Sequence, residues 1–188
     1  MILTVAQVAA GTRCPLDAVA VNWPILCDAL AKHGIDTGPV EVAVAARVAV
    51  ETRYTFRPVR EQWARGQTPE EYFALYAPPT HAAKVLGNRD LADAINLRGA
   101  GFPQLTGRFN FARYGNALTP PVDLIATPEK ALDPDISAEI TALFCKDKGI
   151  PALADTGQYD RCSEVWNGGR NGEPEYLAMT ALLATHLP

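Results

Sequence analysis

The chain has 188 residues and a formal net charge of −4. A chain of this length can bury a sizeable core in one domain without disulfide bonds or a structural metal. Its acidic balance, with no cluster of Lys and Arg, excludes a nucleic-acid partner, because binding to phosphates needs clustered cations.

The first eleven residues, Met-Ile-Leu-Thr-Val-Ala-Gln-Val-Ala-Ala-Gly, contain neither a basic leader nor a continuous apolar run. They do not resemble a secretory signal, so we expect synthesis in the cytoplasm. The longest apolar segment, residues 42–50, is interrupted by Arg47 and is far too short to cross a bilayer. We therefore expect no insertion into a membrane.

Apolar spacing predicts helices along most of the chain. The helix over residues 15–32 begins at Pro15, ends at His33-Gly34 and has one apolar face, formed by Val19, Trp23, Leu26 and Leu30. Residues 40–51 are apolar nearly all round, which predicts a central helix that runs through the core. Further helices are predicted from Thr68 to about Tyr76, from Pro134 to near Gly149, and over 158–166 and 173–186.

The segment from 77 to 121 has a different composition. It contains two Pro-Pro pairs and several glycines, which predicts irregular backbone with at most a few short strands. No linker composition or internal repeat divides the chain. The sequence therefore predicts a mainly α, single domain over residues 1–188, with one loop-rich wall.

The cysteines and histidines do not form a metal-binding pattern. The four cysteines lack the paired short spacings of a zinc site, and no His-Glu-x-x-His motif is present. We expect buried, reduced thiols and no metal or cofactor, and a disulfide between Cys145 and Cys162 is left open. The residues concerned are Cys14, Cys27, Cys145, Cys162, His33, His81 and His186.

Two glutamates have contrasting surroundings. Glu51 ends the predicted central helix, where carbonyl groups and apolar neighbours favour the protonated carboxyl group that a general acid needs. Glu61 is preceded by Arg57 and Arg60 and followed by Arg65, and such basic neighbours keep a carboxylate ionised, as a general base requires.

Both glutamates also have an ordinary interpretation. Glu51 at a frayed helix end would pair with Arg47 or Arg53. Glu61 would form a surface salt bridge with Arg57 or Arg65.

The loop of residues 98–110, Arg-Gly-Ala-Gly-Phe-Pro-Gln-Leu-Thr-Gly-Arg-Phe-Asn, combines three glycines with uncharged polar side chains. Glycines allow a backbone to approach a ligand closely, and Gln104, Thr106 and Asn110 supply neutral donors and acceptors. This composition favours a polar, uncharged ligand. The alternative is that these side chains stabilise turns, as Asn and Thr often do.

Four segments resemble, in order, motifs of the family 19 glycoside hydrolases, which include plant-type chitinases and many phage endolysins. Ala49-Val50-Glu51-Thr52 with the downstream Glu61 resembles the family's His-Glu-Ser/Thr helix end and second Glu. Leu86-Gly87-Asn88 resembles the Leu-Gly-Asn of phage-type members. Residues 98–110 resemble Gly-Arg-Gly-x-x-Gln-Leu-Thr-Gly-Arg-x-Asn-Tyr, and Trp166-Asn167-Gly168-Gly169 resembles Ile-Asn-Gly-Gly.

The resemblance implies a lysozyme-like two-lobed fold and an inverting glycosidase with Glu51 as acid and Glu61 as base. Gln104, Thr106, Asn110 and Asn167 would bind the N-acetyl and hydroxyl groups of the substrate. The phage-like segment favours a monomeric endolysin that cleaves the β-1,4 links of peptidoglycan. A chitinase and a catalytically silent glycan-binding module are the alternatives.

An endolysin of this kind would be made in the host cytoplasm and would reach the cell wall after release. Because an acidic chain is not attracted to an anionic wall, adhesion would come from the cleft or from a separate wall-binding module.

The sequence departs from the family pattern at three positions. Val50 replaces the His before the acid, Ala100 replaces the central Arg of Gly-Arg-Gly, and Phe109 replaces a common Tyr. The missing Arg is the most serious change, because its donor fork could organise two carboxylates. If Glu61 is not the base, Asp90 and Asp93 are the next candidates.

Overall fold

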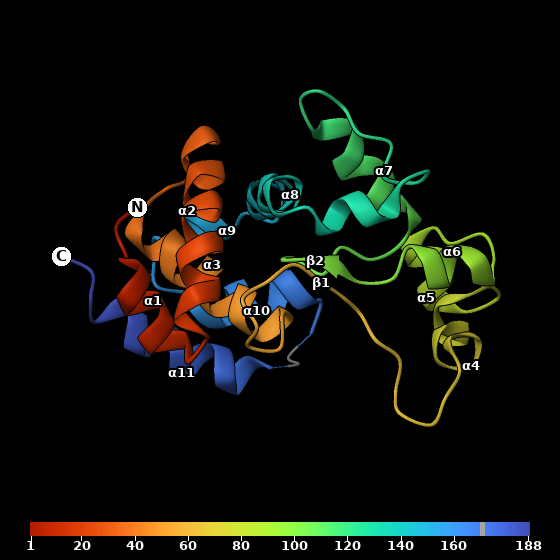
Figure 1. The fold of residues 1–188 in the computed structure, drawn as a ribbon, viewed down its shortest axis with the longest axis horizontal. Helices are drawn as coiled ribbons and strands as arrows, with labels where there is room; N and C mark the ends of the chain where they lie inside the picture. Colours follow the sequence, from red (N-terminus) through yellow and green to blue (C-terminus); the bar gives the residue numbers. More distant parts are fainter. Residues whose placement is uncertain (170–171) are drawn as a thin grey trace. The chain divides into compact units, whose positions relative to one another are not determined.

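The computed structural model describes residues 1–169 and 172–188, and it is mainly α-helical (Figure 1). Helices account for 61% of the chain, and the one sheet in the described part has two strands of two residues each. The prediction of a mainly α chain is confirmed. The chain divides into two compact units, one of residues Met1–Arg57 with Thr141–Pro188, the other of Pro58–Ile140.

The first unit is built around α3 (Gly38–Glu51), the predicted central helix. Its residues from Val40 to Ala49 are all buried, because Val and Ala on every side give it no polar face. It packs against α1, α9, α10 and α11. The other helices of this unit are α1 (Val5–Thr12), α2 (Leu16–Lys32), the carboxyl-terminal part of α8 (Pro134–Asp147), α9 (Ile150–Ala154), α10 (Tyr159–Asn167) and α11 (Glu173–Ala184).

The second unit combines short helices with the small sheet. Strands β1 (Val59–Arg60) and β2 (Ala100–Gly101) pair antiparallel, with Val59 opposite Gly101 and Arg60 opposite Ala100. Phe73, Ala77 and Ala94 form a buried cluster. The helices are α4 (Pro69–Phe73), the 3-10 helix η1 (Ala74–Tyr76), α5 (His81–Leu86), α6 (Leu91–Asn96), α7 (Arg108–Ala117), the 3-10 helix η2 (Pro128–Leu132) and the first part of α8.

Most of the long helices lie where the sequence places them. The predicted apolar face of α2 is buried, and the capping box of Thr68 and Glu71 begins α4. The helices α8, α10 and α11 begin and end within two residues of the predicted limits.

The prediction of irregular backbone from 77 to 121 is wrong. This segment contains α5, α6 and α7 as well as β2. Helices of six residues are too short to show an apolar period, and α5 and α6 begin instead at side-chain caps, Thr80 and Asp90. The short helices α1 and α9 were not predicted for the same reason, although Thr4 and Gln7 form a capping box at α1.

Among the described residues no single helix is long and apolar enough to cross a membrane. The pair α1 and α2 has sufficient length and composition together, but the chain bends by 119° between them.

Candidate functional site

The six predicted site residues lie on both units. Glu51 and Asn167 belong to the first unit, where Glu51 ends α3 and Asn167 ends α10, a helix that packs on α3. Glu61, Gln104, Thr106 and Asn110 belong to the second unit. The structure brings Glu61 and Gln104 together beside Gly99, and it joins Thr106 to Asn110 by a hydrogen bond.

Glu51 lies at the edge of the first unit's core. Its side chain is 15% exposed, so the carboxyl group is largely desolvated while one side still faces solvent. Burial raises the pKa of Glu51, and the charge of Arg47 opposes this shift. The environment expected for a general acid is therefore present at this helix end.

Arg47 lies one helical turn before Glu51, in the same helix, and is fully buried. Its Nη1 is 3.4 Å from Oε1 of Glu51, and its Nη2 donates a hydrogen bond to Oγ of Ser163. The ring of Tyr176 lies 4.6 Å from its guanidinium carbon. The ordinary pairing of Glu51 with Arg47 thus exists, but as a buried contact rather than on a solvated helix end.

Glu61 follows β1 and is held by the Arg98-Gly99 dipeptide. The backbone N–H of Glu61 donates to the carbonyl of Gly99 at 2.7 Å, and the N–H of Gly99 donates to Oε2 of Glu61 at 3.1 Å. Nε of Arg98 donates to the backbone carbonyl of Glu61 at 2.9 Å. These bonds fix the backbone and the carboxylate of Glu61 together.

The basic neighbours of Glu61 differ from the prediction. Arg57 forms an exposed ion pair with Asp17, and the guanidinium of Arg60 donates to the carbonyls of Asn96 and Pro128. Arg98 is a cation near Glu61. Burial lowers the pKa of Arg98, and the charge of Glu61 opposes this shift. The side chains of Arg57 and Arg60 thus have other partners, although both residues come shortly before Glu61 in the sequence.

The glycines of the 98–110 loop serve packing within the second unit. A Cβ atom on Gly99 would lie 2.8 Å from Oε1 of Gln104 and 3.1 Å from Oε2 of Glu61. Gly101 has φ of +79°, and a Cβ there would lie 2.6 Å from the carbonyl of Ala131. Close contact with the protein itself is sufficient to require glycine at these two positions, and the approach of a ligand to this backbone stays a prediction.

The donors of three predicted binding residues are used within the second unit. Nε2 of Gln104 donates to the carbonyls of Val59 and Gly101, at 2.9 and 2.8 Å. The hydroxyl of Thr106 donates to the carbonyl of Gln104, and Nδ2 of Asn110 donates to that of Thr106. The turn-stabilising alternative therefore holds for these donors. No described residue donates to Oε1 of Gln104 or Oδ1 of Asn110, which leaves hydrogen-bond acceptors.

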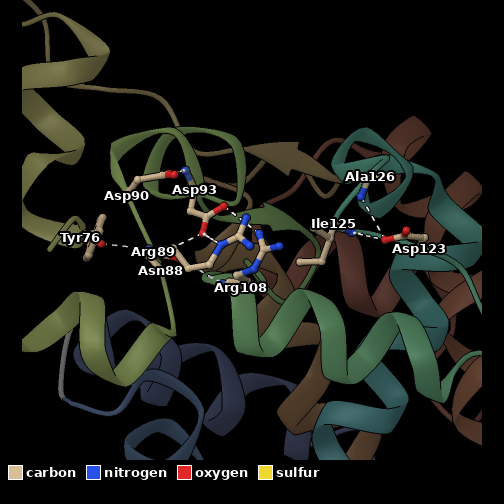
Figure 2. A network of polar contacts seen from close by, with 9 residues as sticks. All are labelled: Tyr76, Asn88, Arg89, Asp90, Asp93, Arg108, Asp123, Ile125 and Ala126. Carbon is tan, nitrogen blue, oxygen red and sulfur yellow. Dashed lines mark hydrogen bonds and ion pairs between the residues drawn. The ribbon is translucent and has the colours of Figure 1, made fainter.

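The reserve candidates for the base, Asp90 and Asp93, have structural partners (Figure 2). Asp90 caps α6 by accepting the N–H of Asp93. Asp93 is buried and pairs with Arg89 at 3.2 Å and with Arg108 at 2.8 Å. Both carboxylates are thus engaged in contacts within the second unit, so neither residue is favoured as the base.

The Leu-Gly-Asn segment has a structural role in this chain. The amide of the buried Asn88 donates to the carbonyl of Tyr76 at 3.0 Å and accepts the N–H of Arg108 at 3.1 Å (Figure 2). It therefore ties η1 to the start of α7, which orients the loop that contains Gln104.

The three residues that depart from the family pattern, Val50, Ala100 and Phe109, all make contacts within the chain. Val50 lies against Gly172, where its Cγ1 would be 2.7 Å from an added Cβ. Ala100 is fully buried in β2, and its backbone is also bonded to Leu105. Phe109 is 62% exposed, and its ring lies over Gly87.

All four cysteines are buried free thiols, so Cys145 and Cys162 are not joined. Burial raises the pKa of Cys162 to about 12, with Asp160 contributing, which keeps this thiol protonated and unreactive. In residues 1–169 and 172–188 no group of three or more His, Cys, Asp and Glu could hold a metal ion.

A scan against models of known protein families gave no match, and a search of curated proteins also gave none.

Sequence reasoning did not identify Arg98 or the partners of Arg47. Arg98 opens the glycine loop, but its contact with Glu61 spans 37 residues and depends on the pairing of β1 with β2. Arg47 was visible as the one basic residue inside an apolar helix, four residues before Glu51. Its contacts with Ser163 and Tyr176 span more than a hundred residues, so no local pattern indicates them.

Gly99→Ala is expected to reduce catalytic rate more than stability. The new methyl group would displace the ends of two side chains, Gln104 and Glu61, and would cost roughly 1 kcal/mol of unfolding free energy. Displacing the carboxylate of Glu61 should lower hydrolysis at least about tenfold, since small misplacements of a catalytic group are costly. Urea unfolding and a glycan hydrolysis assay would measure both.

Gly169→Ala is the matched control, because no atom of the residues that the structure describes lies within 4 Å of a Cβ atom at that position. Equal hydrolysis by Gly99→Ala and the parent would show that the contact between Gly99 and Glu61 is irrelevant to catalysis.

Ala100→Arg, which restores the family residue, is expected to destabilise the chain. Position 100 has no exposed surface and lies opposite Arg60 in the sheet, so the new side chain would be overpacked beside a like charge. Overpacking alone costs roughly 1 to 3 kcal/mol. A thermal melt compared with that of Ala126→Arg, at an exposed position of the same unit, would measure the loss. An unchanged melting temperature with faster hydrolysis would show that the substitution at position 100 is not compensated.

Proposed function

We propose that the chain is the glycosidase domain of a phage-type endolysin, which hydrolyses the β-1,4 links of peptidoglycan by an inverting mechanism. Glu51 is the general acid and Glu61 is the general base. The observation that carries the proposal is Glu51 itself, a carboxyl group at a helix end that is 15% exposed and whose pKa is raised by burial. A raised pKa lets such a group keep its proton to higher pH than an exposed glutamate does, and its partial exposure lets it deliver that proton at the solvent edge.

In the proposed reaction Glu51 donates its proton to the glycosidic oxygen of the leaving sugar. Glu61 takes a proton from a water molecule, whose oxygen attacks the anomeric carbon from the opposite face. The bond to the leaving oxygen breaks as the bond to water oxygen forms, so the anomeric configuration inverts. This mechanism requires the two carboxyl groups to be roughly 6.5 to 9.5 Å apart in the substrate complex.

The surroundings of Glu61 support its role as the base. The charge of Arg98 and the N–H of Gly99 both favour the ionised carboxylate. The pKa of Tyr76 is raised, first by burial and then by the charge of Glu61, so this phenol stays neutral beside it. Glu51 and Glu61 thus differ in the way that an acid and base pair requires.

Substrate contacts in this proposal use acceptors as well as donors. Oε1 of Gln104 and Oδ1 of Asn110 would accept from the N-acetyl N–H and the hydroxyl groups of the glycan. Thr106 keeps lone pairs available while it donates to the backbone. Asn167 is exposed at the end of α10 and would contact the sugar or the attacking water.

We also propose a lysozyme-like fold, in which the two compact units are the two lobes and the loop-rich second unit supplies a cleft wall. The division into a helical unit around α3 and a unit of short helices and loops supports this proposal. As an endolysin, the monomeric domain would be made in the host cytoplasm and would act on the wall after release, aided by a wall-binding module.

Two rival functions have specific support. A chitinase shares the N-acetylglucosamine substrate. A catalytically silent glycan-binding module is favoured by Val50 and Ala100, where the family has His and Arg, and by the internal use of the donors on Gln104 and Asn110.

Incubation with purified peptidoglycan and with chitin oligomers, side by side, distinguishes the three functions. The proposal predicts release of soluble fragments from peptidoglycan at a higher rate than from chitin. Faster cleavage of chitin would indicate the chitinase. Sedimentation of the protein with the wall, without any release, would contradict the proposal and indicate the binding module.

A further inference from the structure

The guanidinium group of Arg47 is the most deeply buried charge next to a proposed catalytic group. Arg47 has no exposed surface, although a buried arginine is costly to desolvate. Its three neighbours come from three helices, which are α3 with Glu51, α10 with Ser163 and α11 with Tyr176. All of these helices belong to the first unit.

Stability of the fold does not explain this placement. A buried ion pair often contributes no more than well-packed apolar side chains of similar size. Moreover, Nε of Arg47 has no hydrogen-bond partner among the described residues, which adds a desolvation cost. A Met or Leu in this apolar helix would fill the space without that cost.

The geometry indicates what the guanidinium group does. One nitrogen, Nη2, is anchored to Ser163, and the face of the group is covered by the ring of Tyr176. Nη1 is thereby presented to the carboxyl group of Glu51, one turn along the helix. The contacts with Ser163 and Tyr176 hold the planar guanidinium group in place. The buried core, and not solvent, therefore sets the position of Nη1.

We propose that Arg47 is a positioning residue, whose anchored guanidinium group fixes the carboxyl group of Glu51 and controls the pH at which it releases its proton. The contact itself stands on the geometry, whereas its catalytic consequence rests on the proposed function.

Two effects act on Glu51 in opposite directions. Burial raises its pKa, and the charge of Arg47 lowers it. Without the cation, Glu51 would hold its proton to higher pH. With it, the carboxyl group stays acidic enough to transfer the proton, which is what a general acid requires.

The other titratable groups around Arg47 do not change charge in the same range. Among the described residues, the titratable groups that interact with Arg47 are Glu51, Tyr176 and Cys162. Burial raises the pKa of Cys162 to about 12 and also raises that of Tyr176, with Cys145 and Tyr159 adding to the shift of Tyr176. The thiol and the phenol therefore stay protonated at neutral pH and do not interfere with the titration of Glu51.

The test is a titration of the Glu51 carboxyl carbon by NMR in the parent, Arg47→Gln and Arg47→Lys, with Glu51→Gln used to assign the signal. Arg47→Gln is expected to raise the pKa of Glu51 by about one unit or more, since an opposite charge at this distance lowers it by 1 to 3 units. Arg47→Lys keeps the charge, so the pKa should stay nearer to that of the parent. A pKa of Glu51 that is the same in the parent and Arg47→Gln would overturn the proposal.

The pH dependence of hydrolysis gives the second measurement. Activity is lost as pH rises through the pKa of the acid, so Arg47→Gln should move the alkaline limb to higher pH. Arg47→Lys should leave that limb nearly in place but lower kcat at least about fivefold, because one ammonium group cannot contact Ser163 and Glu51 in the same fixed geometry. Equal kcat in Arg47→Lys and the parent would contradict the positioning role.

The two measurements separate this proposal from the proposed function. The NMR titration reports on the pair even if the chain hydrolyses no glycan, in which case the proposed function alone fails. If Arg47→Gln does not fold, Arg47→Lys carries the test through its kcat. In an active parent, an unmoved Glu51 titration in folded Arg47→Gln, or an equal kcat in Arg47→Lys, would overturn the role of Arg47 alone.

Discussion

Replacing Glu51 by Gln is expected to lower glycan hydrolysis at least about 100-fold, because general acid catalysis contributes roughly 10² to 10⁴ in rate. The amide keeps the shape of the side chain but has no proton to donate to the leaving oxygen. KM should change little, since Glu51 acts on the reacting bond. Initial rates on peptidoglycan, measured for the parent and the variant, give the ratio.

Glu164→Gln is the matched control, because Glu164 lies in the same unit but its side chain is 49% exposed in a surface ion pair. Its rate should equal that of the parent. If Glu51→Gln keeps more than about a tenth of the activity, a barrier change of only about 1.4 kcal/mol, Glu51 is not the acid.

The structure also corrects an expectation about the stability of this variant. From the sequence alone, Glu51→Gln should leave the fold nearly intact. Above the pKa of Glu51, however, the variant removes the ionised carboxylate that pairs with the fully buried charge of Arg47, although the amide oxygen can still accept its hydrogen bond. We therefore expect a loss of roughly 1 to 3 kcal/mol in the free energy of unfolding, measured by urea titration.

Replacing Glu61 by Gln is expected to lower the rate by a similar factor, but azide should restore part of the turnover. The base activates water, and azide attacks the anomeric carbon without the removal of a proton. The amide oxygen can still accept the N–H of Gly99, so the loop should keep its structure. Mass spectrometry would detect a glycosyl azide, and NMR would show that its configuration is inverted.

Azide is not expected to rescue Glu51→Gln with an ordinary leaving group, because the missing step there is protonation. This difference separates the two roles. Full activity of Glu61→Gln without azide would move the base elsewhere in the chain, and the partners of Asp90 and Asp93 make both unsuitable.

The sequence predicts the long helices because each has an apolar period and recognisable ends. The central helix, α3, and the partial burial of its last residue follow from a run of Val and Ala that ends at Glu51. The pKa of that residue is raised by desolvation, which a local pattern can indicate. The sequence around Glu51 is therefore sufficient to predict the environment of one of the two proposed catalytic groups.

The second unit is less predictable, because long-range contacts decide it. Arg57 and Arg60 come shortly before Glu61 in the sequence. The side chain of Arg57, however, binds Asp17, and that of Arg60 binds the carbonyls of Asn96 and Pro128. The cation that acts on Glu61 is Arg98, which depends on strand pairing. The short helices α5 and α6 are specified by single capping residues, which carry less information than an apolar period.

Mass spectrometry of the fragments that the purified chain releases from peptidoglycan tests whether the chain is a glycosidase. We expect soluble muropeptides with intact peptide stems, each with a new reducing-end sugar that has gained one water, and no such products from Glu51→Gln. The identity of that sugar gives the bond that is cleaved. Fragments with cut peptide stems and intact glycan strands, or the absence of any fragments, would contradict the proposed glycosidase activity.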